Sequence, residues 1–173
     1  MYAYLKHCES DKEYAQFTLF FIRNRTDFHS ELSVRDVLHR ILENIEHSHI
    51  LLAYDSTQSP IAWVQYWYTD EEQEPSSDEE NLFIDSLFID KKNRSTRTFF
   101  KLFSELFNQI AEENKQIKDV RFCALANNKY VNRLYSKFAT IIGQRESYRG
   151  TDNIYSTDFK QLLHSANRKN RKM

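Results

Sequence analysis

Four cationic side chains gather between an apolar run and an amphipathic segment: Lys91, Lys92, Arg94 and Arg97. The run LFIDSLFI before them is typical of a buried strand, and apolar residues recur after them with helical spacing. The first turn of a helix has unpaired N–H groups and the positive end of the helix dipole, so a cationic loop there can bind anions. The stretch is a candidate phosphate or pyrophosphate site. The alternative is an ordinary solvated loop, which the absence of glycine favours.

The rest of the chain supplies the elements that must hold this stretch in place. Apolar periodicity, turn residues and cap residues predict the order β, α, α, β, β, β, α, β, α, β, β. The expected strands are 2–8, 49–55, 61–69, 82–89, 117–126, 140–150 and 153–159, and the expected helices begin near residues 10, 33, 96 and 127. The second and third strands are joined closely enough to be antiparallel, whereas 117–126 should run parallel to 82–89 through a helical crossover.

Composition limits the class of protein. The chain has 173 residues, of which 40% are hydrophobic, so we expect one domain with a real core. The net charge of −1 argues against a nucleic-acid partner, and no apolar run approaches the ~18 residues of a membrane span. Three histidines, His39, His47 and His49, lack a partner cluster, so we expect no metal site. The two distant cysteines and the lack of a signal-peptide pattern predict a cytoplasmic protein.

Two strongly charged stretches carry no assigned element. Residues 70–81, DEEQEPSSDEEN, are either a solvated loop or an electrostatic funnel for a cationic substrate. The basic end, 161–173, is expected to be a flexible tail outside the domain formed by 1–160, with a nucleic-acid contact as the alternative.

In this order of elements, the chain resembles the GNAT superfamily of N-acetyltransferases from Tyr2 to about Phe159. The family carries an Arg/Gln-Gly-x-Gly-x-Gly/Ala signature in the strand–loop–helix unit. The residues standing there are Arg94, Ser95, Thr96, Arg97, Thr98 and Phe99. Arg94 matches, and the three glycine positions are replaced. The resemblance implies that backbone amides of this loop hold the pyrophosphate of acetyl-CoA. Arg97 could add a phosphate contact.

A second match to the family is NKYVNRLYSKF, which is similar to the family's N-x-x-A-x-x-x-Y-x-K stretch. Asn128, Tyr135 and Lys137 are in register. The resemblance implies that Tyr135 protonates the departing thiolate of CoA and that Asn128 and Lys137 belong to the CoA site, with Asn128 on the pantetheine arm. The alternative, from the residues alone, is that Tyr135 belongs to an apolar stripe and its hydroxyl finds a partner in the core.

Acetyl transfer to an amine needs a base, a donor to the tetrahedral oxyanion and a proton for the thiolate. In the family the oxyanion donor is a backbone N–H of the bulged strand, which falls here near Leu87 or Phe88, with Ile89 following. Asp85 is the first candidate base, with Glu79, Glu80 or a water chain as alternatives. Asp85 could equally be a strand carboxylate facing solvent. No Cys/His pairing indicates a covalent intermediate, so direct transfer is expected.

The sequence thus predicts an α/β protein with the GNAT-like acyltransferase fold, a mixed and mostly antiparallel sheet with a central parallel pair. The expected activity is transfer of an acetyl group from acetyl-CoA to a primary amine of a small cationic molecule or a protein. Two alternatives stay open: a GNAT-like binding protein without activity, which the missing glycines favour, and an acetyltransferase acting on tRNA or a ribosomal protein. The oligomeric state is left open.

Overall fold

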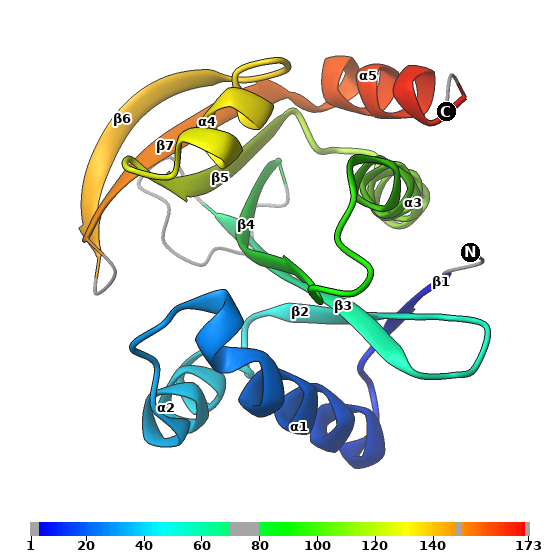
Figure 1. Ribbon diagram of the computed structural model, residues 1–173. Helices are drawn as coiled ribbons and strands as arrows, with labels where there is room; N and C mark the ends of the chain where they lie inside the picture. The colour runs from blue at the N-terminus through cyan, green and yellow to red at the C-terminus, as the bar shows by residue number, and fades with distance from the viewer. Residues whose placement is uncertain (1–3, 70–79, 148–149, 172–173) are drawn as a thin grey trace. The chain divides into compact units, whose positions relative to one another are not determined.

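The structure is a computed structural model that describes residues 4–69, 80–147 and 150–171 (Figure 1). Its elements are β1 (Tyr4–His7), α1 (Asp11–Phe28), α2 (Val34–Asn44), β2 (His49–Tyr54), β3 (Pro60–Thr69), β4 (Asn81–Ile89), α3 (Thr96–Glu113), β5 (Asp119–Leu125), α4 (Lys129–Tyr135), β6 (Thr140–Ser147), β7 (Gly150–Asp158) and α5 (Phe159–Arg171). All eleven elements expected from the sequence are present in the expected order, and α5 is additional.

The seven strands form a mixed sheet in the order β1-β2-β3-β4-β5-β7-β6. β4 and β5 pair in parallel, in a register that runs from Asn81 opposite Asp119 to Ile84 opposite Phe122. The pairs β1–β2, β2–β3, β5–β7 and β6–β7 are antiparallel. The predicted hairpin, the parallel crossover and the mostly antiparallel sheet are therefore confirmed. The last strand, β7, lies between β5 and β6, an arrangement that strand periodicity does not reveal.

The chain divides into two compact units, and β3, β4 and α3 each run through both. The first unit comprises Met1–Tyr66 and Ser86–Glu105, and the second comprises Trp67–Asp85 and Leu106–Met173.

In the first unit, α1 and α2 pack on one face of β2 and β3 (Figure 1). Trp63 is at the centre of this core. Its ring lies 4.4 Å from that of Phe88 and 4.5 Å from that of Phe21, and the rings of Phe17, Phe20 and Phe28 surround it within 6.0 Å. Its indole Nε1 donates to Ser86 Oγ at 3.1 Å. Aromatic rings thus surround Trp63, and its one polar group is satisfied within the core.

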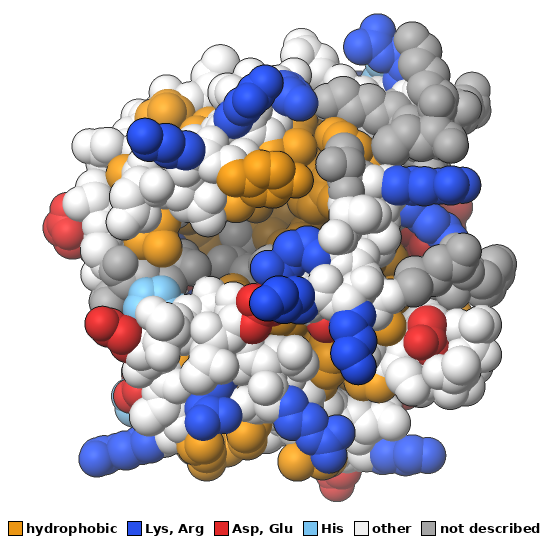
Figure 2. All heavy atoms as spheres, viewed as in Figure 1, with side chains coloured by type: hydrophobic (Ala, Val, Ile, Leu, Met, Phe, Trp, Pro, Cys, Tyr) orange, Lys and Arg blue, Asp and Glu red, His pale blue; other side chains and the backbone are white. Residues whose placement is uncertain are grey.

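Helix α2 is less buried than its periodicity predicts. Apolar residues recur along it at helical spacing, which predicts one buried face made of Val34, Val37, Leu38, Ile41, Leu42 and Ile45. Of these, Val37 and Ile41 are buried. Val34, Leu38 and Leu42 are 41%, 42% and 72% exposed. Hydrophobic side chains are accordingly visible at the lower edge of the surface, over α1 and α2 (Figure 2). The apolar stripe is wider than the surface available to bury it.

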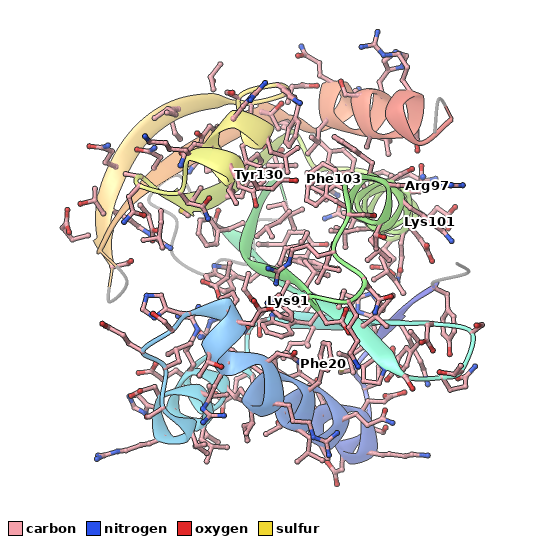
Figure 3. The ribbon with its side chains drawn as sticks, in the orientation of Figure 1. Phe20, Lys91, Arg97, Lys101, Phe103 and Tyr130 are labelled. Carbon is pink, nitrogen blue, oxygen red and sulfur yellow. The ribbon has the colours of Figure 1, made fainter. Side chains whose placement is uncertain are left out.

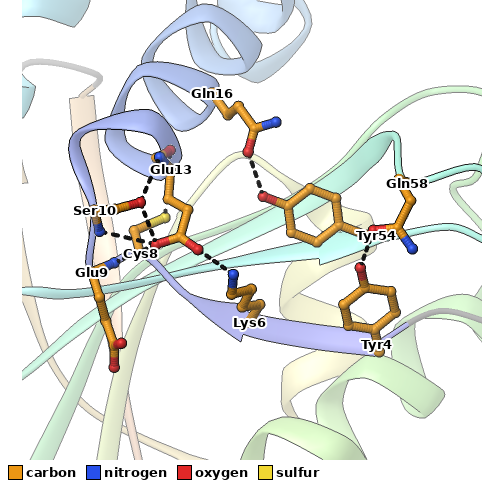
Figure 4. Close-up of polar contacts among 9 residues, drawn as sticks. All are labelled: Tyr4, Lys6, Cys8, Glu9, Ser10, Glu13, Gln16, Tyr54 and Gln58. Atoms are coloured by element: carbon orange, nitrogen blue, oxygen red, sulfur yellow. Dashed lines mark hydrogen bonds and ion pairs between the residues drawn. The ribbon is translucent and has the colours of Figure 1, made fainter.

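Helix α1 begins with a capping box that also binds β1 (Figure 4). Ser10 Oγ accepts from the backbone N–H of Glu13, and Glu13 Oε2 accepts from the N–H groups of Glu9 and Ser10 at 2.9 and 3.0 Å. The other carboxylate oxygen of Glu13 forms an ion pair with Lys6 on β1. The contact with Lys6, followed by the two backbone N–H groups, lowers the pKa of Glu13 to about 2. Both charged residues thus fix the start of α1 against β1.

This lowered pKa predicts an acid-sensitive contribution to stability. A carboxyl group ionised more easily in the folded chain stabilises it above the unfolded pKa, near 4.5, and the contribution is lost as pH falls toward 2. Glu13→Gln should therefore melt below the wild type at pH 6, and the difference in Tm should shrink as pH falls from about 4.5 to about 2. Thermal melts of both proteins across this range provide the measurement. A difference in Tm that stays constant with pH would contradict the assignment.

In the second unit, β5, β7 and β6 carry the short helix α4, and α5 packs beside the end of α3. The ring of Phe159 lies 5.9 Å from that of Phe107, and the side-chain amides of Asn108 and Asn167 donate to each other at 2.9 and 3.0 Å. Residues 159–171 form a helix, where a flexible tail was expected for 161–173. The helix forms because Phe159, Leu162 and Ala166, spaced by three and four residues, make a small buried face. The many basic and polar residues between them hide this spacing in the sequence.

Candidate functional site

The cationic loop in the first unit is ordered by its own side chains. Asp90 Oδ1 accepts from the backbone N–H and the side-chain amide of Asn93 at 2.9 and 2.8 Å. The N–H of Asp90 donates to Ile61 O on β3 at 2.9 Å, which fastens the loop where β4 ends. A loop without glycine thereby acquires a defined turn through an aspartate, a residue that favours such turns.

Arg94 binds within the chain. Its Nε and one terminal nitrogen donate to Ile89 O at 3.1 and 3.0 Å, and that nitrogen also lies 2.7 Å from Asp27 Oδ2 at the end of α1. The guanidinium lies over the ring of Phe88, 5.4 Å from its centroid. Arg94 therefore ties the loop to β4 and α1, and its role as a phosphate contact stays a prediction.

The three positions at which the sequence lacks a family glycine have separate local roles. Ser95 precedes α3, and its Oγ accepts from the backbone N–H of Thr98 at 3.1 Å, as an N-cap does. Phe99 is buried against the rings of Phe100 and Phe103, at 5.2 and 4.9 Å. The phenyl group thus turns into the apolar face of α3 and away from the exposed side of the helix, while Arg97 is exposed.

Positive charge surrounds this helix start. Lys91 and Lys92 are exposed on the loop, and Arg97 and Lys101 extend from the same side of α3 (Figure 3). Cations and the N-terminal end of a helix dipole both favour an anion. Lys91, Lys92 and Arg97 thus lie at the start of α3 as expected, Lys101 adds a further cation, and anion binding by this loop stays a prediction.

The predicted residues of β4 alternate between two faces of the strand. Phe88 is buried beside Trp63, and Ser86 on the same face accepts from the Trp63 indole. Asp85 and Leu87 alternate with them and are half-buried, while Ile89 is buried. Asp85 is thus directed to the opposite face of the strand from Ser86 and Phe88.

The predicted residues of α4 lie in the second unit. Asn128 is its N-cap, with Oδ1 accepting from the N–H of Val131 at 3.1 Å, and Lys137 is exposed beyond its end. Tyr135 is the last residue of the helix and is half-buried. Its ring lies 4.6 Å from that of Phe122 and 5.6 Å from that of Tyr155, edge to face with both. The structure fixes the ring by packing.

Comparison of the sequence alone finds no family model and no curated protein that matches. Comparison of the structure does find matches. Aminoglycoside acetyltransferase AAC(6')-Ib with coenzyme A and kanamycin matches at a TM-score of 0.68 and 13% identity, over 95% of this chain and 99% of the other. Spermidine N-acetyltransferase from Vibrio cholerae with CoA and spermine matches at a TM-score of 0.67 and 10% identity, over 93% of this chain and 98% of the other. The chain has the GNAT fold. Ribosomal-protein-S5-alanine acetyltransferase from Vibrio fischeri matches this GNAT fold at a TM-score of 0.65 and 10% identity, over 91% of this chain and 93% of the other.

One polar residue with several hydrogen bonds in the second unit, Asn132, was not predicted from the sequence. Asn132, in the middle of α4, donates to Leu125 O and accepts from Asn153 and Tyr155. The expected stripe of Val131, Leu134, Tyr135 and Phe138 is half-buried, and no residue of α4 is fully buried. An asparagine four residues after the N-cap, inside an apparently apolar helix, was the signal available.

Two further expectations concern charge and metals. Of the acidic stretch, residues 70–79 lie outside the described residues, so Glu79 and the funnel stay untested; Glu80 pairs with Lys118 Nζ at 2.5 Å. Among the described residues, no group of three or more His, Cys, Asp or Glu side chains could hold a metal ion. Within the same residues, no helix is long and apolar enough to cross a membrane.

Proposed function

We propose that the protein transfers an acetyl group from acetyl-CoA to a primary amine. The observation that carries the proposal is the GNAT fold itself, together with the cations around the start of α3. Spermidine N-acetyltransferase and aminoglycoside acetyltransferase share this fold, and both were solved in complex with coenzyme A. The acceptor we favour is a cationic amine, because residues 70–80 of the sequence are strongly acidic.

In the proposed reaction the amine attacks the thioester carbonyl carbon directly. A C–N bond forms, the C–S bond breaks, and the amine proton passes to a base, for which Asp85 is our candidate. A backbone N–H near Leu87 or Phe88 would stabilise the oxyanion, and Tyr135 would give its phenolic proton to the departing thiolate. The loop amides of Ser95, Thr96 and Arg97, with the Arg97 side chain, would bind the pyrophosphate, since the Thr98 amide donates to Ser95 Oγ. Asn128 and Lys137 would bind the rest of CoA.

A second candidate is a GNAT-fold binding protein without transferase activity. One observation favours it: Arg94, the residue of the loop that matches the family signature, is bound to Asp27 and Ile89 O. Three of the five N–H donors of its guanidinium, at Nε and at one terminal nitrogen, are directed to these two partners, so Arg94 offers fewer donors to a phosphate.

Thermal melting with acetyl-CoA separates the two candidates. A ligand at ~100 times its dissociation constant adds about 2.7 kcal/mol to the free energy of unfolding. For a chain of this size the Tm should rise by roughly 5–10 °C. Release of CoA from acetyl-CoA in the presence of spermidine or kanamycin then tests transfer. A flat Tm up to millimolar acetyl-CoA would favour the binding protein and contradict the proposed activity.

Arg97→Ala tests the phosphate contact. A hydrogen bond to a charged group is worth about 1.5–3 kcal/mol, so CoA should bind roughly 10- to 150-fold more weakly. Titration calorimetry measures the affinity, and Arg35→Ala on the exposed side of α2 is the matched control, in which CoA affinity should stay at the wild-type value. Equal CoA affinity in Arg97→Ala and wild type would remove Arg97 from the site.

A further inference from the structure

Helix α4 has only partial apolar burial. It spans Lys129–Tyr135, and none of its residues is buried. Isolated helices shorter than about 12–15 residues are marginal in water. Two residues that the proposed function needs, Asn128 and Tyr135, are the N-cap and the last residue of this helix. Hydrogen bonds must therefore add to the ring packing around Tyr135 in fixing their positions.

Asn132 supplies that interaction with its whole side-chain amide. Nδ2 donates to Leu125 O at 2.7 Å and to Asn128 O at 2.8 Å. Oδ1 accepts from Asn153 Nδ2 at 2.8 Å and from the Tyr155 hydroxyl at 2.7 Å. Because backbone carbonyls only accept, the two contacts to Leu125 O and Asn128 O also determine which terminal atom of the amide is the nitrogen. An asparagine amide has two N–H donors and one oxygen with two lone pairs, so its capacity is fully used.

The network reaches the Tyr135 ring through Tyr155. The two rings lie 5.6 Å apart at 80°, and Phe122 stacks on Tyr155 at 5.7 Å while meeting Tyr135 edge-on at 4.6 Å. On the other side, Gln144 Nε2 on β6 donates to Asn153 Oδ1 at 2.8 Å, so Asn153 is held as well. Asn132 thus connects the β5–α4 turn, β7 and the packing around Tyr135.

We propose that Asn132 is a positioning residue for acetyl transfer: it holds Tyr155 and the turn before α4, and through them it holds the Tyr135 hydroxyl in the direction of the leaving thiolate. The inference rests on the proposed function. Asparagine is required because aspartate cannot donate to the two carbonyls and leucine can neither donate nor accept. The residue acts without touching the reacting atoms.

A double-mutant cycle with Tyr135→Phe tests this role. Asn132→Asp keeps the shape but loses both donors, and kcat should fall about 10- to 100-fold, the scale of a misplaced reacting group. Tyr155→Phe deletes a single hydroxyl and keeps the ring, and kcat should fall about 3- to 10-fold. In the Tyr135→Phe background, both changes should leave kcat almost unaltered, because the group they position is already absent.

Tyr54→Phe is the matched control. Its hydroxyl donates to Gln16 at 2.9 Å within the first unit, so the change removes a comparable bond that belongs to neither α4 nor its network, and kcat should stay near the wild-type value in both backgrounds. All kcat values are taken well below each variant's Tm. If Asn132→Asp does not fold, the cycle of Tyr155→Phe with Tyr135→Phe tests the positioning role by itself.

The outcomes separate the two proposals. If wild type neither binds acetyl-CoA nor turns over, the proposed function fails before any variant is compared, and this inference falls with it. If wild type is active but the Asn132 and Tyr155 changes lower kcat by the same factor with and without the Tyr135 hydroxyl, the proposed function stands and the positioning role is overturned. Non-additive losses restricted to kcat, with acetyl-CoA affinity preserved, support it.

Discussion

Tyr135→Phe should lower kcat by about 10²- to 10⁴-fold while the affinity for acetyl-CoA stays nearly intact. The change deletes one hydroxyl and keeps the ring packed against Phe122 and Tyr155. General-acid assistance by a positioned group is typically worth this much, and without it the thiolate departs unprotonated. Steady-state kinetics with acetyl-CoA and an amine acceptor give kcat, and calorimetry gives the affinity.

Tyr130→Phe is the control for this change, because Tyr130 is on the same helix and 65% exposed (Figure 3). It should keep the kcat of the wild type. If Tyr135→Phe melts lower by the equivalent of one hydrogen bond, about 0.5–1.5 kcal/mol, yet turns over at the wild-type rate, Tyr135 is a structural residue and another group donates the proton.

Trp63→Ala should destabilise the chain by about 3–5 kcal/mol, the range of large aromatic truncations in a core. The indole contacts rings from α1 and from β4, including Phe21 at 4.5 Å and Phe88 at 4.4 Å, so its loss leaves a cavity bordered by two elements. Chemical denaturation followed by circular dichroism measures the free energy of unfolding.

Ser86→Ala separates packing from hydrogen bonding at the same place. It keeps every ring and leaves the Trp63 Nε1–H buried without its acceptor, which should cost about 1–3 kcal/mol. A Trp63→Ala loss no greater than that of Ser86→Ala would mean that the aromatic cluster relaxes to fill the space, and that it is not the centre of this core.

Local signals predicted the fold well. The helices expected near residues 10 and 33 begin there, with Ser10 and Ser33 as N-caps, and the apolar residues of α3 from Phe99 to Ile110 are buried as expected. These features depend on residues within one or two turns of each other. The position of β7 between β5 and β6 depends instead on hydrogen bonds between distant segments, which leave no periodic mark in the sequence.

The candidate site was predicted less completely, for a related reason. The cations near the start of α3 could be found because they are adjacent in sequence. The partners of Arg94 could not, because Asp27 is 67 residues away and an arginine in a loop is equally compatible with a bound anion. Asn132 shows the same limit: its hydrogen bonds join α4 to β5 and β7, so its structural role depends on contacts between segments that are distant in sequence.

In the cationic loop, the side chains at the family's glycine positions make substitution by glycine costly. Glycine at 95 would lose the hydroxyl that caps α3, and glycine at 99 would remove a buried ring and place the most flexible residue in a helix. Each of these two substitutions alone lowers stability before any gain in ligand contact. The loop is therefore a coupled unit, in which a glycine-rich redesign requires several changes at once.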